Sequence, residues 1–231
     1  MRRGVTLLEL LVAISLMGMV SLGLLFGLRI AASAWQKGNS RLAADRQVLA
    51  AGDLFAQQVA NARPRKVNVG PLDRQIQVFY FQGEHDRLRF LTATSLSGRS
   101  RSGLWLAEYS FRVDDGGRCK LTYNEWPFRE DSDAAPTILG LREDAVSHRQ
   151  VVRFAEPAQN PQTRDLYHDL DSCGFEYLTQ RLGEDPRWEP EWISDRPLLP
   201  PAVAARFRSR EGRGIAPVAM VASFNVREIK P

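Results

Sequence analysis

One ionisable side chain, that of Glu9, lies inside the longest apolar stretch of the chain, which runs from Val5 to Leu28. A carboxylate carried into a bilayer costs about 3 kcal/mol even on mild insertion scales, so it needs a partner of opposite charge. If the chain is cut after Gly4, the new amine of Val5 lies one helical turn from Glu9, where the helix dipole also favours a negative charge. Beside a similar helix, the carboxylate of one subunit would neutralise the amine of the next, and a buried pair that loses one member is heavily destabilised. Glu9 is therefore predicted to set the register of assembling helices.

The three histidines do not form a recognisable catalytic group. His85, His148 and His168 lie in or beside predicted loops or strand starts, and no nucleophile elbow such as GxSxG accompanies them. Segment 165–171 carries His168 and three aspartates, but it lacks the central Gly and terminal Glu of an EF-hand calcium loop. Asp115-Gly116-Gly117 is better explained as a hairpin turn than as a phosphate-binding loop. We therefore expect no catalytic residue, no metal and no cofactor, and keep a membrane-anchored periplasmic enzyme as the alternative from another class.

The chain has two cysteines, Cys119 and Cys173. An oxidising compartment would permit a disulfide between them, and closing a loop of that length contributes about 4 kcal/mol on the chain-entropy model. Two buried free thiols are the alternative, and the sequence leaves both open. No Cys/His spacing indicates a metal site.

The elements that carry these residues begin with a helix. Residues 5–28 are long enough to cross a bilayer, and Arg2 and Arg3 before them favour a cytoplasmic N-terminus. Residues 29–63 continue the helix in amphipathic form until Pro64. Its apolar face is predicted from two rows that recur every seven residues, one of Trp35, Leu42, Leu49 and Ala56 and a second beside it of Val48, Phe55 and Ala62. A secretory signal peptide cut before Trp35 is disfavoured, because the apolar run is too long for an ordinary signal and the helical pattern continues past it.

From Gln75 the pattern alternates with period two, which predicts strands, and a head domain is expected over residues 64–231. The clearest hairpin has its turn at 114–117. Together with the long helix, this predicts an α+β fold with the helix packed on antiparallel sheet. The strands are expected at 75–82, 87–92, 104–113, 118–123, 150–154, 174–179, 203–208 and 218–226, and loops at 129–136, 156–163 and 183–201.

The N-terminal residues Arg3-Gly4-Val5-Thr6-Leu7-Leu8-Glu9 and the apolar run after them resemble the class III signal of type IV pilins and type II secretion pseudopilins. The resemblance implies that a prepilin peptidase removes residues 1–4 by cutting between Gly4 and Val5 and then methylates the amine of Val5. It also implies that Glu9 acts in assembly and that the fold is pilin-like. The mature protein would be a single-pass protein of the inner membrane with a periplasmic C-terminal head.

The head contains landmarks similar to those of the J-type minor pseudopilins (the GspJ family) of type II secretion. These landmarks are Leu106-Ala107-Glu108-Tyr109 before the hairpin, Leu170 to Tyr177, Trp188, Trp192 and Leu199-Pro200-Pro201-Ala202-Val203. The resemblance implies a tip subunit that assembles with I- and K-type minor pseudopilins and primes the fibre of the major pseudopilin. A minor pilin of a type IV pilus or a DNA-uptake system carries the same signal and is the close alternative.

The charge of the chain is mild and excludes a strongly basic nucleic-acid binder. The formal net charge is +4, and removal of Arg2 and Arg3 with the leader takes away two positive charges and leaves +2. Acidic and basic residues are mixed along the chain rather than gathered in a stripe. No nucleic-acid partner is expected.

Overall fold

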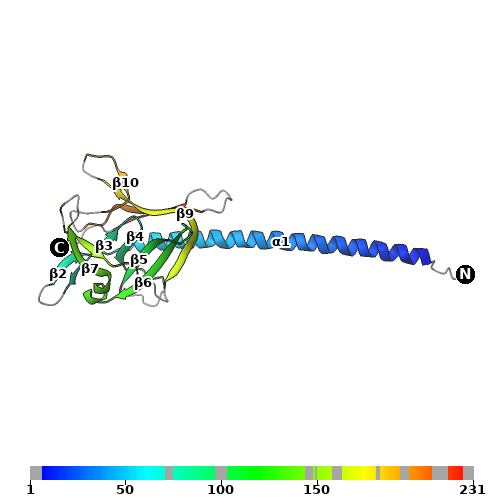
Figure 1. Ribbon diagram of the computed structural model, residues 1–231, viewed down its shortest axis with the longest axis horizontal. Coiled ribbons are helices and arrows are strands. Elements are labelled where there is room, and N and C mark those ends of the chain that lie inside the picture. The colour runs from blue at the N-terminus through cyan, green and yellow to red at the C-terminus, as the bar shows by residue number, and fades with distance from the viewer. Residues whose placement is uncertain are drawn as a thin grey trace. The chain divides into compact units, whose positions relative to one another are not determined.

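The computed structural model describes residues 7–70, 75–96, 103–143, 148, 150–157, 163–180, 183–192, 198–209 and 218–225. The chain forms two compact units, Met1–Leu49 and Ala50–Pro231. Helix α1 runs from Leu7 to Ala60, and its last turns belong to the second unit, the head. Antiparallel strands make up most of the head (Figure 1). The predicted α+β fold, with a long N-terminal helix followed by antiparallel sheet, is confirmed.

Helix α1 ends at Ala60, three residues before the predicted boundary. The chain leaves the helix because the following residues bond to the end of a strand. The Arg63 amide donates to the Leu91 carbonyl at 2.7 Å, and the Ala93 amide donates to the Asn61 carbonyl at 3.1 Å. Pairing with the sheet therefore stops the helix before Pro64 can do so.

The main sheet of the head has eight strands, all antiparallel to their neighbours, in the order β12-β11-β9-β6-β5-β4-β3, with β10 paired to β9. Two further pairs, β1-β2 and β7-β8, are separate two-stranded sheets. The bounds are β1 Lys66–Val69, β2 Ile76–Phe79, β3 Phe81–Gly83, β4 Arg87–Thr92, β5 Leu104–Val113, β6 Cys119–Phe128, β7 Ile138–Glu143, β8 Gln150–Phe154, β9 Arg164–Thr179, β10 Arg187–Glu189, β11 Ala202–Ser209 and β12 Val218–Ser223.

The last turns of α1 pack on one face of the main sheet. Phe55 is fully buried and meets the Tyr109 ring edge to face, with the ring centroids 5.2 Å apart. Val59 and Ala62 are also buried. Two more rings pack against Tyr109 on this face: Phe90 is stacked on it and Tyr123 is tilted against it.

The buried face at the end of the helix includes residues of the second predicted row, because Phe55 and Ala62 are buried. Ala51 and Val59 are buried with them. In the first predicted row, Trp35 is 78% exposed and Leu49 is 67% exposed.

A second apolar layer covers the opposite side of strands β4 and β5. It contains Leu91 and Leu106 of the sheet, Val67 and Val78 of the β1-β2 pair, and Phe154 of β8. Tyr80 joins this layer, with its ring edge to face against Phe154 at 5.6 Å.

Several strands differ from their predicted bounds. The predicted strand 75–82 is divided into β2 and β3, because β2 pairs with β1 whereas β3 pairs with β4. Strand β9 begins at Arg164, ten residues before the predicted start, and β6 continues to Phe128. The short strands β1, β7 and β10 were not predicted, and β10 lies in a segment predicted to be loop. In the predicted loop 129–136 the structure has two 3-10 turns, Asp131–Asp133 and Ala135–Thr137.

Candidate assembly site

The residues predicted to act in processing and assembly lie at the N-terminal end of the chain. Gly4 and Val5, the predicted cleavage and methylation residues, lie outside the described residues, which begin with Leu7. Glu9 lies in the first turn of α1 and is exposed. The positive end of the helix dipole lies at the same place and favours its carboxylate.

The surface around Glu9 is apolar on every side of the helix. Segment Leu7–Asn39 is long and apolar enough to cross a membrane by length and composition. A helix that is apolar all round requires lipid or another protein around it. Within this segment, the large apolar side chains that are more than half exposed are Leu7, Leu8, Leu10, Leu11, Val12, Ile14, Leu16, Met17, Met19, Val20, Leu22, Leu24, Leu25, Phe26, Leu28, Ile30 and Trp35.

Two serines of this segment satisfy their hydroxyl hydrogen bonds within the helix itself. Ser15 Oγ donates to the Leu11 carbonyl and Ser21 Oγ donates to the Met17 carbonyl, both at 2.8 Å. Internal pairing of this kind allows a hydroxyl to lie in an apolar surrounding at little cost. Glu9 therefore differs from the serines in chemistry, because a carboxylate carries a charge that no backbone carbonyl neutralises.

Gly18, Gly23 and Gly27 leave space beside the backbone of the same helix. A Cβ added at any of the three would meet no atom within 4 Å. Small residues allow the backbones of two membrane helices to approach closely. Gly23 and Gly27 are spaced as a small-xxx-small pair, which fits close packing against a companion helix.

A buried polar network fixes the end of α1 in the head. Gln58 is fully buried. Its Oε1 accepts from the Tyr109 hydroxyl at 2.6 Å, and its Nε2 donates to the Tyr123 hydroxyl at 2.5 Å. Tyr123 in turn donates to Glu125 at 2.7 Å. Burial raises the pKa of both tyrosines well above the ordinary value, so both are neutral hydrogen-bond donors at physiological pH.

This network was not predicted, because its signal is not local. Gln58 is one polar residue on a helix, and its partners lie 51 and 65 positions further along the chain. The buried ion pair of Arg89 and Glu108 was not predicted for the same reason, and both side chains are 1% exposed. Asn124 also donates to Glu108, at 2.8 Å. The Glu108 carboxylate on β5 therefore has a partner on each neighbouring strand, Arg89 on β4 and Asn124 on β6.

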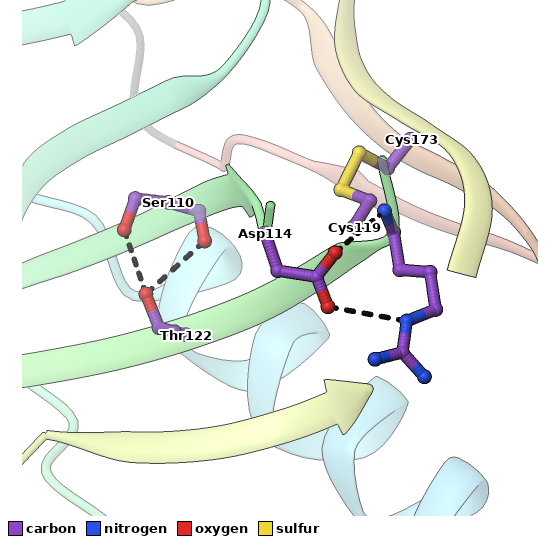
Figure 2. Close-up of a disulfide and its surroundings, with 6 residues drawn as sticks. Ser110, Asp114, Cys119, Thr122 and Cys173 are labelled. Atoms are coloured by element: carbon purple, nitrogen blue, oxygen red, sulfur yellow. Dashed lines mark hydrogen bonds and ion pairs between the residues drawn. A yellow bond between two sulfur atoms is a disulfide. The ribbon is translucent and has the colours of Figure 1, made fainter. Parts of the chain in front are cut away.

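The two cysteines meet at one end of the sheet. Cys119 and Cys173 form a disulfide that joins the first residue of β6 to β9, with the two Cα atoms 6.4 Å apart (Figure 2). Of the two alternatives left open by the sequence, the structure has the bonded pair. Across the same region Ser110 and Thr122 bond side chain to side chain between β5 and β6, at 2.7 Å (Figure 2).

The hairpin beside the disulfide is held by Asp114. Its Oδ1 accepts from the amides of Gly116 and Arg118, each at 2.9 Å, and its Oδ2 lies 3.2 Å from Arg118 Nε. The amide of Arg118 above all lowers the pKa of the Asp114 carboxyl below its usual value. Gly117 has φ of 71°, a conformation that favours glycine. The predicted turn 114–117 is thus present with a local reason for each position.

Two of the three histidines considered as catalytic candidates, His85 and His148, have contacts in the structure that do not involve a nucleophilic side chain. The His85 ring packs over Gly174, where an added Cβ would overlap it, and the His85 carbonyl accepts from the Phe175 amide at 2.7 Å. His148 lies 3.2 Å from Glu143 and both are exposed. Within the part of the chain that the structure describes, no group of three or more His, Cys, Asp or Glu residues could hold a metal ion.

The aromatic landmarks of the head have structural roles. Tyr177 is fully buried and its hydroxyl donates to the Glu84 carbonyl at 2.9 Å. The indole of Trp192 donates to the Leu198 carbonyl at 3.1 Å. The Arg206 guanidinium lies over the Trp188 ring, 5.6 Å from its centroid. These contacts join β9 to the β3–β4 turn, β10 to β11, and the segment after β10 to the segment before β11.

Comparison with known proteins places the N-terminus in a recognised class. Residues 1–25 match the model of the prokaryotic N-terminal methylation motif. No curated protein and no solved structure matches the chain. The motif, together with an exposed apolar helix and a β-sheet head, supports a subunit of the pilin or pseudopilin type.

Proposed function

We propose that the protein is a non-enzymatic subunit of a pilin-like fibre, and more narrowly a J-type minor pseudopilin at the tip of a type II secretion pseudopilus. The observation that carries the proposal is the methylation motif over residues 1–25, continued by a helix whose apolar surface is exposed. The order of landmarks from Leu170 to Val203 supports the narrower assignment, because it resembles that of the J-type family.

In this proposal the chain is inserted in the inner membrane with its N-terminus in the cytoplasm and the head, residues 64–231, in the periplasm. Prepilin peptidase removes residues 1–4 and methylates Val5. The helix then leaves lipid for contact with companion helices, and Glu9 neutralises the amine of a neighbouring subunit. The neighbours are I- and K-type minor pseudopilins and the major pseudopilin. The helix supplies the contacts of assembly, and the head specifies which subunit stands at the tip.

The test compares two variants on the same helix. Glu9→Leu removes the charge, whereas Ser15→Leu removes a hydroxyl that bonds within its own helix. Both variants are expected to be cut and inserted as the wild type is. Only Glu9→Leu should fail to co-purify with the I- and K-type subunits from solubilised membranes and fail to support secretion. Normal co-purification and secretion with Glu9→Leu would contradict the pairing of carboxylate and amine.

The same purification distinguishes the close alternative. Mass spectrometry of the proteins that co-purify with the wild type should identify pseudopilins of a secretion system. Recovery of pilins of a type IV pilus or DNA-uptake system instead would assign the subunit to that fibre and overturn the narrower proposal.

A further inference from the structure

The disulfide lies where the pairing of two strands is irregular. Cys119 is opposite Leu170 in the β6-β9 ladder, and the register shifts twice within the next three residues of β6. Cys173 is three residues beyond Leu170, where β9 is paired with Phe207 of β11. The covalent bond therefore holds β9 to the start of β6 at the end of an irregular ladder.

The two cysteine residues differ in exposure. Cys119 is 3% exposed and has strand neighbours on both sides, Val113 in β5 and Leu170 in β9. Cys173 is partly exposed. In a folded head with reduced cysteines, a reagent from solvent therefore reaches Cys173 before Cys119.

We propose that the head is a substrate of thiol–disulfide exchange in which Cys173 reacts first with an external disulfide oxidant and Cys119 resolves the mixed disulfide. The Cys173 thiolate attacks one sulfur of the oxidant, the oxidant's S–S bond breaks, and one oxidant thiolate leaves. The Cys119 thiolate then attacks the Cys173 sulfur, which forms the Cys119–Cys173 bond and releases the second oxidant thiolate. In total two protein thiols lose two electrons and two protons, and the oxidant's disulfide becomes a dithiol.

The partner is thus a disulfide oxidant of an oxidising compartment, and the head must fold where such an oxidant acts. This inference concerns the maturation of the head and does not depend on pilus assembly. A protein that proved to be another kind of anchored protein would still undergo this exchange.

The test uses the full chain in detergent as two single-cysteine variants, Cys119→Ser and Cys173→Ser, each treated with oxidised glutathione. Mass spectrometry follows the mixed disulfide with time. Cys119→Ser, which retains the accessible Cys173, should be modified about tenfold faster than Cys173→Ser. In denaturant the two rates should become equal, which shows that folding causes the difference. Equal rates in the folded variants, or faster reaction of Cys119, would overturn the order of the two thiols.

Two further measurements keep the test independent of how well the variants fold. Wild-type protein that has been reduced, treated with oxidised glutathione and quenched with acid should carry glutathione on the peptide that contains Cys173. Alkylation of living cells before lysis should find neither cysteine free in the wild type. Free thiols in the mature protein in cells would show that the head does not meet an oxidant and would overturn the proposal, whatever the outcome of the co-purification experiment.

Discussion

At the scale of single residues, the best-defined polar contacts of the head centre on Gln58. Its side-chain amide is fully buried and bonds to the hydroxyls of two tyrosines. Its Nε2 also donates to the Thr94 carbonyl at 3.1 Å. No apolar side chain can replace these bonds, because the tyrosines would keep buried hydroxyls without this partner.

Gln58→Ala is therefore expected to lower the free energy of unfolding by about 3 kcal/mol, the cost of leaving buried polar groups unsatisfied. The matched control is Gln57→Ala on the exposed side of the same turn, which should change it by about 0.5 kcal/mol or less. Denaturant unfolding of the two full-length variants in detergent measures both values. Equal effects of the two substitutions would show that the network does not stabilise the junction of helix and sheet.

Asp114 gives a prediction about pH. Its pKa is lower in the folded protein than the usual aspartate value, so its carboxylate stabilises the fold above the unfolded-state pKa. This contribution is lost as pH falls through the lowered, folded-state pKa. Asp114→Ala should therefore melt at a lower temperature than the wild type at pH 7, and the difference should shrink below about pH 4.

The control for this experiment is Asp115→Ala, a substitution of the next exposed carboxylate in the same turn. Melting of the three proteins between pH 7 and pH 2.5 should show the pH-dependent difference for Asp114→Ala alone. A difference that persists unchanged in acid would mean that the turn depends on the side chain's shape rather than on its charge.

At the scale of elements, two glycines show how packing decides the effect of one methyl group. Gly52 lies in α1, and a Cβ there would meet Met220 at an ordinary distance of 3.9 Å. Gly83 ends β3, and a Cβ there would lie 2.9 Å from both Phe81 and Trp192. The first site has room for a methyl group and the second does not.

Gly52→Ala is expected to stabilise the protein by up to about 1 kcal/mol, because alanine is the better helix former. Gly83→Ala is expected to destabilise it by about 1–3 kcal/mol through overpacking. Thermal unfolding of the two variants measures the opposite signs. The same sign for both would indicate that the contact between α1 and β12, or the one around Gly83, differs from that described.

The sequence determined the elements best where the signal was local. The turn at Asp114 predicts its hairpin, and β5 and β8 have the predicted bounds. The length of β9 was underestimated from the sequence, because the charged residues Asp165 and Asp171 resemble those of a solvated loop. In the structure the strand is paired with neighbouring strands on both sides. Strands β1, β7 and β10 were missed, because they are short and depend on tertiary partners.

At the scale of the whole molecule, the two units differ in their surface and packing. The helix from Leu7 to Ile30 has an apolar surface with one carboxylate at its start. The head after Leu49 has its own aromatic core, polar network and disulfide. The N-terminal methylation motif was predictable because its residues lie within one segment, and the role of Glu9 in assembly stays a prediction. The contacts of Gln58 and Arg89 were not predictable, because they depend on the register of the sheet.

The central claim is that the mature chain begins at Val5 because it is processed as a pilin-like subunit. The most direct measurement is mass spectrometry of the N-terminus of the protein from cells with and without prepilin peptidase. We predict a methylated Val5 as the first residue when the enzyme is present and an intact leader when it is absent. A mature protein that begins at Trp35, or that keeps Met1 to Gly4 in the presence of the enzyme, would contradict the account.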